Sequence, residues 1–127
     1  MIHPFADMIG LEVEEHRPGF SKLNLKITEQ HLNPNGVVHG AVLFALADTG
    51  MGEALYQTLA EGELCATIEV KINYFKPVLP ALLTCTTEII NRGKSVANLE
   101  SRVWSEGILV AQANGNYAIF RPRNGAT

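Results

Sequence analysis

The chain has 127 residues, of which 46% are hydrophobic and 18% charged, and its 13 acidic and 10 basic side chains give a formal net charge of −3. This length suits one domain, so we expect residues 1–127 to form a single domain. A weak negative charge without a Lys/Arg run argues against nucleic acid or an anionic membrane as a partner. Because the charged fraction lies below the ~25% of an average domain, we expect surplus apolar surface, and hence oligomerisation or an apolar groove.

Other features of the sequence argue against a disulfide, a metal site, an export signal and a membrane span. Cys65 and Cys85 form no CxxC pair, and the four histidines form no HxxxH or HxH pair, so we expect neither a disulfide nor a metal site. The N-terminal residues have neither the basic region nor the long apolar region of an export signal. The longest low-charge stretch, 37–47, is shorter than the ~20 residues of a membrane span. We therefore expect a cytoplasmic protein.

The first third of the chain predicts a short helix and a β-hairpin. Pro4 precedes residues that suit a helix to Ile9, where Pro is favoured in the first turn. Alternating apolar residues at 11–14 and 20–27 flank the turn dipeptide Pro18-Gly19 and predict two paired strands. Residues 31–36 have the composition of a loop.

A long helix is predicted from His39 to near Glu61-Gly62, because apolar residues recur there at three- and four-residue spacing. This helix is apolar on nearly all sides, which predicts burial. Gly50 and Gly52 each cost it ~1 kcal/mol relative to Ala, so we expect another group to approach the helix closely.

Four long strands are predicted after the helix, at 67–75, 82–90, 95–104 and 108–120, separated by turn residues. One long buried helix among such strands indicates an α+β fold, in which an antiparallel sheet wraps a central helix. Since a sheet covers only part of such a helix, we expect a second copy of the chain to cover the exposed flank.

The start of the long helix is one candidate site. The first N–H groups of a helix, here at Gly40 and Ala41, have no partner within it, and they carry the positive end of the helix dipole. They could hold a carbonyl oxygen that becomes negative during acyl transfer. Without a Cβ, Gly40 would let a substrate approach the backbone. The alternative is that Gly40 only permits a turn.

Asp48 is the second candidate, because it is a carboxylate within an apolar helix. No Lys or Arg lies three or four residues away on either side. Such a group is typical of a general base. Alternatively, Asp48 reaches solvent or pairs with a basic residue of a strand.

Other polar residues leave their alternatives open. His39 could be a base, although a His at a helix start is more often a structural hydrogen-bonding residue. Asn33 could cap its loop or orient a water molecule. The turn Arg92-Gly93-Lys94-Ser95 could take a phosphate group, but a solvated hairpin tip is the simpler explanation.

Taken together, these residues resemble a known family. Asn33, Gly36, His39-Gly40 and, nine residues after the His, Asp48 within Leu46-Ala-Asp-Thr resemble the hotdog-fold thioesterases of the phenylacetic-acid-pathway (PaaI-like) type. The resemblance extends over the whole chain and implies a long central helix wrapped by a highly curved antiparallel sheet. One departure is that Ala41 stands where the family usually has a second Gly.

The resemblance implies hydrolysis of acyl-CoA thioesters at a homodimer interface, with two dimers often forming a homotetramer. Asp48 would be the general base or nucleophile, and the Gly40 N–H would polarise the thioester carbonyl. Asn33 would place the water or carbonyl, His39 would lie beside the thioester, and Thr67 would position water. Asp48 and Thr67 would face Asn33 and Gly40 of the other subunit. Arg92, Gly93, Lys94 and Ser95 would meet the CoA phosphates. No cofactor is implied, since coenzyme A is part of the substrate.

Two other functions remain open. Related hydratases and dehydratases resemble His31-x-x-Pro34 but place the helix carboxylate fourteen residues after that His, where this chain has Ala45. A non-catalytic acyl-CoA or lipid-binding module would have no need of Asp48. The acyl group itself, aryl or aliphatic, is left open by Phe44, Met51, Leu55 and Tyr56 as candidate pocket residues.

Overall fold

The computed structural model describes residues 3–123. Two α-helices, one short 3₁₀ helix and six strands follow one another as α1 (Pro4–Ile9), β1 (Leu11–Arg17), β2 (Phe20–Lys26), η1 (Glu29–His31), α2 (Gly40–Tyr56), β3 (Leu64–Tyr74), β4 (Leu82–Arg92), β5 (Val96–Ser105) and β6 (Ile108–Phe120). All neighbouring strands are antiparallel, in the order β1-β2-β4-β5-β6-β3. The sheet is open, and β1 and β3 are its edges.

The N-terminal predictions are confirmed. The imidazole of His3 accepts a hydrogen bond from the Ala6 N–H at 3.2 Å, Pro4 stands in the first turn of α1, and Gly10 ends the helix at a φ of 83°. Gly19, with a φ of 84°, makes the turn between β1 and β2. At positive φ a residue with a Cβ is strained, so glycine suits both turns.

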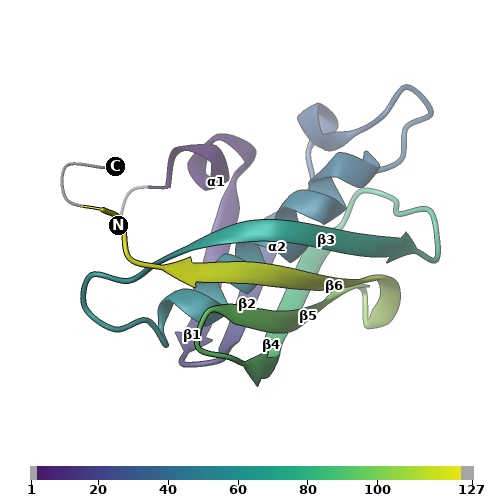
Figure 1. Cartoon of the computed structure of the whole chain (residues 1–127). Helices are drawn as coiled ribbons and strands as arrows, with labels where there is room; N and C mark the ends of the chain where they lie inside the picture. Colours follow the sequence, from purple (N-terminus) through teal and green to yellow (C-terminus); the bar gives the residue numbers. More distant parts are fainter. Residues whose placement is uncertain (1–2, 124–127) are drawn as a thin grey trace.

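Helix α2 contacts all six strands, which is possible only because the sheet curves around it. Figure 1 shows the helix lying across the sheet, with β3 and β6 toward one side and β1 and β2 toward the other. Leu46, Met51 and Leu55 are completely buried between helix and sheet. The predicted wrapping of a buried helix by an antiparallel sheet is confirmed.

The predicted end of α2 near residue 61 is wrong. The helix ends at Tyr56, because the N–H and the hydroxyl of Thr58 both bond the Leu55 carbonyl, each at 2.8 Å. These bonds tighten the last turn and stop the helix. Leu59 still packs on the core from the turn beyond, which explains why the apolar spacing continues past the helix.

The predicted strands are confirmed with small shifts at their ends. Strand β3 begins three residues earlier than predicted, where Leu64 pairs with Phe120, and β4 runs two residues further, to Arg92. A bulge lies between Thr67 and Glu69 on β3. The ends are set by pairing with the neighbouring strand, which a local alternation pattern does not report.

At Gly50, α2 packs tightly against the sheet. A Cβ there would stand 2.5 Å from the Thr87 hydroxyl, and the Ser21 hydroxyl donates to the Gly50 carbonyl at 2.7 Å. Next to this contact, Ser101 donates to the Ala47 carbonyl at 2.9 Å. The predicted close approach is therefore confirmed at Gly50. It is wrong at Gly52, whose nearest neighbour is the Tyr117 hydroxyl at an ordinary 3.9 Å.

The two cysteines are free thiols, and Cys85 is completely buried. Burial raises the pKa of the Cys85 thiol to about 12, so at pH 8 almost none of it is the reactive thiolate. We expect iodoacetamide at pH 8 to leave Cys85 unmodified in the native protein and to modify it in guanidinium chloride, as read by peptide mass mapping. Rapid native modification would contradict this burial.

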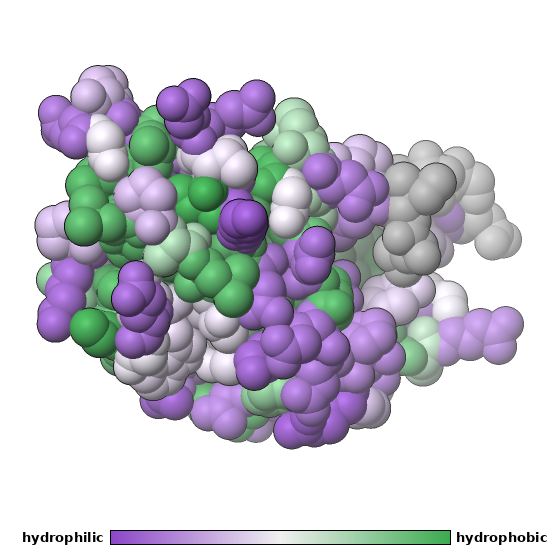
Figure 2. Space-filling view, turned by 180° about the vertical axis from the view of Figure 1, so that it is seen from behind, coloured by the Kyte–Doolittle hydropathy of each residue, from purple (hydrophilic) through white to green (hydrophobic). Residues whose placement is uncertain are grey.

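Much apolar surface stays exposed on the single chain. Figure 2 shows apolar groups gathered mainly on the left half of this face. The exposed large hydrophobic residues are Phe5, Met8, Val13, Tyr56, Leu64, Ile68, Tyr74, Phe75, Leu79, Leu82, Ile90, Val96, Ile108 and Phe120. The surplus of apolar surface that the low charged fraction predicts is therefore present. Within residues 3–123, no helix is long and apolar enough to cross a membrane.

Candidate active site

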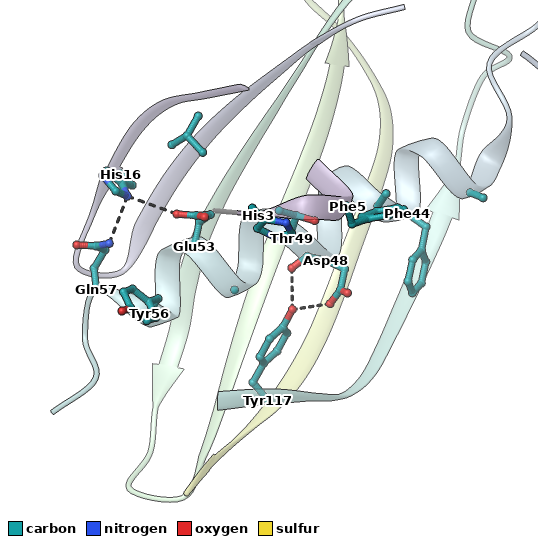
Figure 3. A pocket seen from close by; sticks show the side chains of 14 residues that line it. His3, Phe5, His16, Phe44, Asp48, Thr49, Glu53, Tyr56, Gln57 and Tyr117 are labelled. Atoms are coloured by element: carbon teal, nitrogen blue, oxygen red, sulfur yellow. Dashed lines mark hydrogen bonds and ion pairs between the residues drawn. The ribbon is translucent and has the colours of Figure 1, made fainter. Parts of the chain in front are cut away.

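One face of α2 is left uncovered by the sheet and borders a groove of about 750 Å³. Phe44, Asp48, Gly52 and Tyr56 lie on this face, because residues four apart share one side of a helix. Figure 3 shows the side chains of Phe44, Asp48 and Tyr56 together with Phe5 from α1 and His16 from β1. The full lining is His3, Phe5, Val13, His16, Ala41, Phe44, Ala45, Asp48, Thr49, Gly52, Glu53, Tyr56, Gln57 and Tyr117.

Two of the four predicted pocket residues are elsewhere. Phe44 and Tyr56 line the groove, but Met51 and Leu55 are completely buried against the sheet. Each residue advances the helix by about 100°, so Met51 and Leu55 are turned by about that angle from Gly52 and Tyr56, the groove residues that follow them. An all-round apolar helix does not reveal which face the sheet will cover, and this explains the error.

Asp48 is held by two hydroxyl groups from neighbouring strands. The Thr67 hydroxyl donates to Asp48 Oδ1 at 2.9 Å, and the Tyr117 hydroxyl donates to the same oxygen and, at 2.7 Å, to the Asp48 carbonyl. Thr67 on β3 stands directly opposite Tyr117 on β6, so the sheet register places both beside the helix. Within residues 3–123, no basic side chain pairs with Asp48. Its second oxygen, Oδ2, accepts no hydrogen bond from the described residues.

Tyr117 is a site residue that sequence reasoning missed. It is 4% exposed, and burial, together with its hydrogen bond to Asp48, raises the pKa of its phenol well above the usual value. The phenol therefore stays protonated at physiological pH and acts as a donor. The available signal was its inward position in β6, after the small residues Ala111, Ala113 and Gly115.

The start of α2 differs from the expectation in two respects. The Ala41 N–H donates to His39 Nδ1 at 2.9 Å, so only the Gly40 N–H is left without an acceptor among residues 3–123. His39 thus caps the helix, the structural alternative for this residue. A Cβ at Gly40 would also be a tight fit, because the Tyr74 ring lies 3.2 Å from that position.

Asn33 caps its own loop. Its side-chain oxygen accepts from the N–H of Asn35 at 2.9 Å and of Val37 at 3.4 Å. Of the two alternatives left open for this amide, the protomer uses the cap.

The structure divides the predicted site residues into two groups. Asp48 and Thr67 are in contact, but Gly40 lies eight residues before Asp48 on the same helix, a separation of about 12 Å along its axis at 1.5 Å per residue. The Gly40 N–H and the Asp48 carboxylate of one chain therefore cannot act on the same carbonyl group.

At the β4–β5 turn, Arg92 is engaged within the protomer. Its guanidinium donates to the Thr58 hydroxyl at 3.2 Å and to the Gly93 carbonyl at 2.7 Å, and lies 3.5 Å from Glu63. At Gly93 a Cβ would stand 2.4 Å from the Val96 carbonyl oxygen, so the tight turn requires glycine. Lys94 and Ser95 are exposed at its tip.

Polar residues lie at the end of the groove near β1. His16 Nδ1 is 3.4 Å from Glu53 Oε2 and 3.2 Å from Gln57 Nε2. Figure 3 shows His16 and Gln57 on the side of Glu53 that faces away from Asp48 and Tyr117. Residues 3–123 contain no cluster of three His, Cys, Asp or Glu side chains that could hold a metal ion.

A long helix wrapped by an open antiparallel sheet of six strands, with a polar constellation on its uncovered face, defines the hotdog fold of thioesterases. Residues 35–112 match the model of the thioesterase superfamily, and the chain therefore belongs to that family of thioester-hydrolysing enzymes. This confirms the resemblance noted in the sequence, as well as the expected fold and enzyme class.

Named relatives agree with this assignment. The acyl-coenzyme A thioesterase PaaI of Escherichia coli strain K12 is 25% identical over 120 residues, which cover 94% of this chain and 79% of that protein. The 1,4-dihydroxy-2-naphthoyl-CoA hydrolase of Listeria monocytogenes is 27% identical over 100 residues, 79% of this chain and 81% of its own. A mutant of the phenylacetic acid degradation protein PaaI from Thermus thermophilus superposes with a TM-score of 0.86 at 27% identity, covering 91% of this chain and 98% of that structure.

Proposed function

We propose that this protein hydrolyses acyl-CoA thioesters to the free acid and CoA, with Asp48 as general base or nucleophile. The observation that carries the proposal is the carboxylate itself, oriented by the Thr67 and Tyr117 hydroxyls at the side of a groove large enough for an acyl group. Because both hydroxyls bond Oδ1, the Oδ2 atom remains available for chemistry.

Asp48 can act as a base or as a nucleophile, and both routes give complete hydrolysis of the thioester. As a base, Oδ2 takes a proton from water while the water oxygen attacks the thioester carbonyl; the C–S bond then breaks and the CoA thiolate takes up the proton. As a nucleophile, Oδ2 attacks the carbonyl and expels CoA, and water hydrolyses the resulting anhydride. Single turnover in ¹⁸O-labelled water separates the two, since only the nucleophilic route can place the label in Asp48.

The active enzyme in this proposal is a homodimer that completes the site. Asp48 and Thr67 of one protomer would act on a carbonyl polarised by Gly40 of the partner subunit, since about 12 Å separates the two groups within a chain. His39 and Asn33 of the partner subunit would shape that end of the site. Strand β3 is an exposed sheet edge of eleven residues, which can pair with a second copy. Two such dimers would form the tetramer.

The exposed β3 edge predicts how the dimer can be disrupted. Replacing Ile68, which is 56% exposed, with Lys puts like charges on the two edges that would pair. We expect Ile68→Lys to dissociate at protein concentrations at which the wild type sediments as a dimer or tetramer in analytical ultracentrifugation. Ile90→Lys, at a similarly exposed bulge of the interior strand β4, is the matched control. An Ile68→Lys protein that keeps the dimer would exclude β3 pairing.

The CoA phosphates would lie at the turn of Arg92, Gly93, Lys94 and Ser95. Arg92 is already bonded to Thr58 and Glu63, so Lys94 at the exposed tip is the better phosphate partner. The groove suits aryl and aliphatic acyl groups alike, because Phe5, Val13 and Phe44 contribute apolar surface to it.

The test is thiol release from a panel of acyl-CoAs that varies chain length and aryl substitution. We expect saturable hydrolysis of at least one class. Saturable acyl-CoA binding without thiol release over a long incubation would contradict the proposal and favour a non-catalytic binding module.

A further inference from the structure

Tyr74, the last residue of β3, packs on the first residue of α2. Its ring stands 3.2 Å from the position a Gly40 Cβ would occupy, and its hydroxyl donates to the Gly40 carbonyl at 2.9 Å. The ring also borders a hollow of about 290 Å³ at this end of the helix, which Gly40 and Val78 line as well. Burial of the phenol raises the pKa of Tyr74, so it stays a donor at neutral pH.

The peptide group between Gly40 and Ala41 is therefore held at both ends. Tyr74 bonds its carbonyl oxygen, and His39 Nδ1 accepts its N–H at 2.9 Å. A peptide group is planar, so two hydrogen bonds on opposite sides fix its orientation. The Gly40 N–H, which belongs to the preceding peptide group, is the neighbouring donor left without an acceptor among residues 3–123.

We propose that Tyr74 is a positioning residue, which together with the His39 cap orients the first turn of α2 so that the Gly40 N–H points at the substrate carbonyl. This inference rests on the proposed thioesterase function, and it changes the reason for glycine at position 40. The missing Cβ makes room for the Tyr74 ring rather than for the substrate. A preoriented donor stabilises the developing oxyanion without reorganisation during the reaction.

The first test is Tyr74→Phe, which keeps the ring and removes the hydroxyl. We expect kcat for acyl-CoA hydrolysis to fall about 3- to 10-fold, the loss of one hydrogen bond, with KM within about twofold of wild type. The melting temperature should change little, because Tyr74 is half exposed. An unchanged kcat, or a rise in KM alone, would overturn the positioning role.

The second test compares Gly40→Ala in two backgrounds. In the wild type the new methyl group meets the Tyr74 ring, and we expect kcat to fall at least about tenfold. In Tyr74→Ala that obstacle is absent, so the loss of kcat caused by Gly40→Ala should be at least about threefold smaller than in the wild type. Equal losses in both backgrounds would mean that the substrate itself needs the space, and would overturn the inference.

A third measurement does not depend on catalysis. We expect amide hydrogen exchange of Ala41, followed by NMR, to be several-fold faster in Tyr74→Phe than in wild type, with the rest of α2 unaffected. Unchanged exchange would show that Tyr74 does not hold the Gly40–Ala41 peptide group, whatever the activity. If the wild type hydrolyses no thioester but the exchange rate changes as expected, the proposed function fails, while the positioning of this peptide group by Tyr74 stands.

Discussion

Asp48→Asn should lower kcat for acyl-CoA hydrolysis by about 10²- to 10⁴-fold, while leaving the fold intact. The amide oxygen of Asn can still accept the hydrogen bonds of Thr67 and Tyr117, but an amide neither takes a proton from water nor attacks a carbonyl. Steady-state thiol release measures the loss, and circular dichroism reports the fold.

The only other aspartate of the sequence supplies the control for this substitution. Asp7→Asn makes the same chemical change on α1, outside the lining of the groove, and should retain wild-type activity. An Asp48→Asn enzyme as active as Asp7→Asn would remove Asp48 from the mechanism and with it the core of the proposed function.

A large effect on stability is expected at Gly50. Although Ala is the better helix former by about 1 kcal/mol, a Cβ at Gly50 would stand 2.5 Å from the Thr87 hydroxyl, which is bonded to Ser101 at 2.6 Å. We expect Gly50→Ala to lower the free energy of unfolding by about 1–3 kcal/mol, because a packed core resists added volume. Urea unfolding measures it.

Gly52→Ala is the matched control, since its new methyl group faces the groove with only the Tyr117 hydroxyl nearby, at 3.9 Å. It should raise the free energy of unfolding by about 0.5–1 kcal/mol through helix propensity alone. The penalty at Gly50 should also shrink in a Thr87→Ala background. If both glycines respond alike, the contact with Thr87 does not explain Gly50.

Secondary structure was largely predictable, because each element carries its own periodicity. The hairpin turn at Pro18-Gly19 and the apolar spacing of α2 are local signals that short segments report by themselves. The end of α2 was not predictable, since Leu59 keeps the helical spacing although it packs on the core from beyond the helix. The strand ends were not predictable either, because pairing with the neighbouring strand, rather than alternation, decides them.

The candidate site was predictable where residues lie close in sequence. Asn33, His39, Gly40 and Asp48 form a pattern within sixteen residues, and a carboxylate without a nearby cation stands out in an apolar helix. The contact between Gly40 and Tyr74 was not predictable, because Tyr74 lies 34 positions further along the chain.

The sequence alone determined a buried helix within a β-rich chain, the polar residues at its start and the carboxylate on it, because periodicity and composition are properties of neighbouring residues. Only the tertiary structure decided what those residues touch. Tyr117 reaches Asp48 across 69 positions, and Arg92 is bonded to Thr58 across 34. Strand register and the curvature of the sheet around α2 set these contacts, and both arise from pairing between distant segments, for which one chain segment carries no local signal.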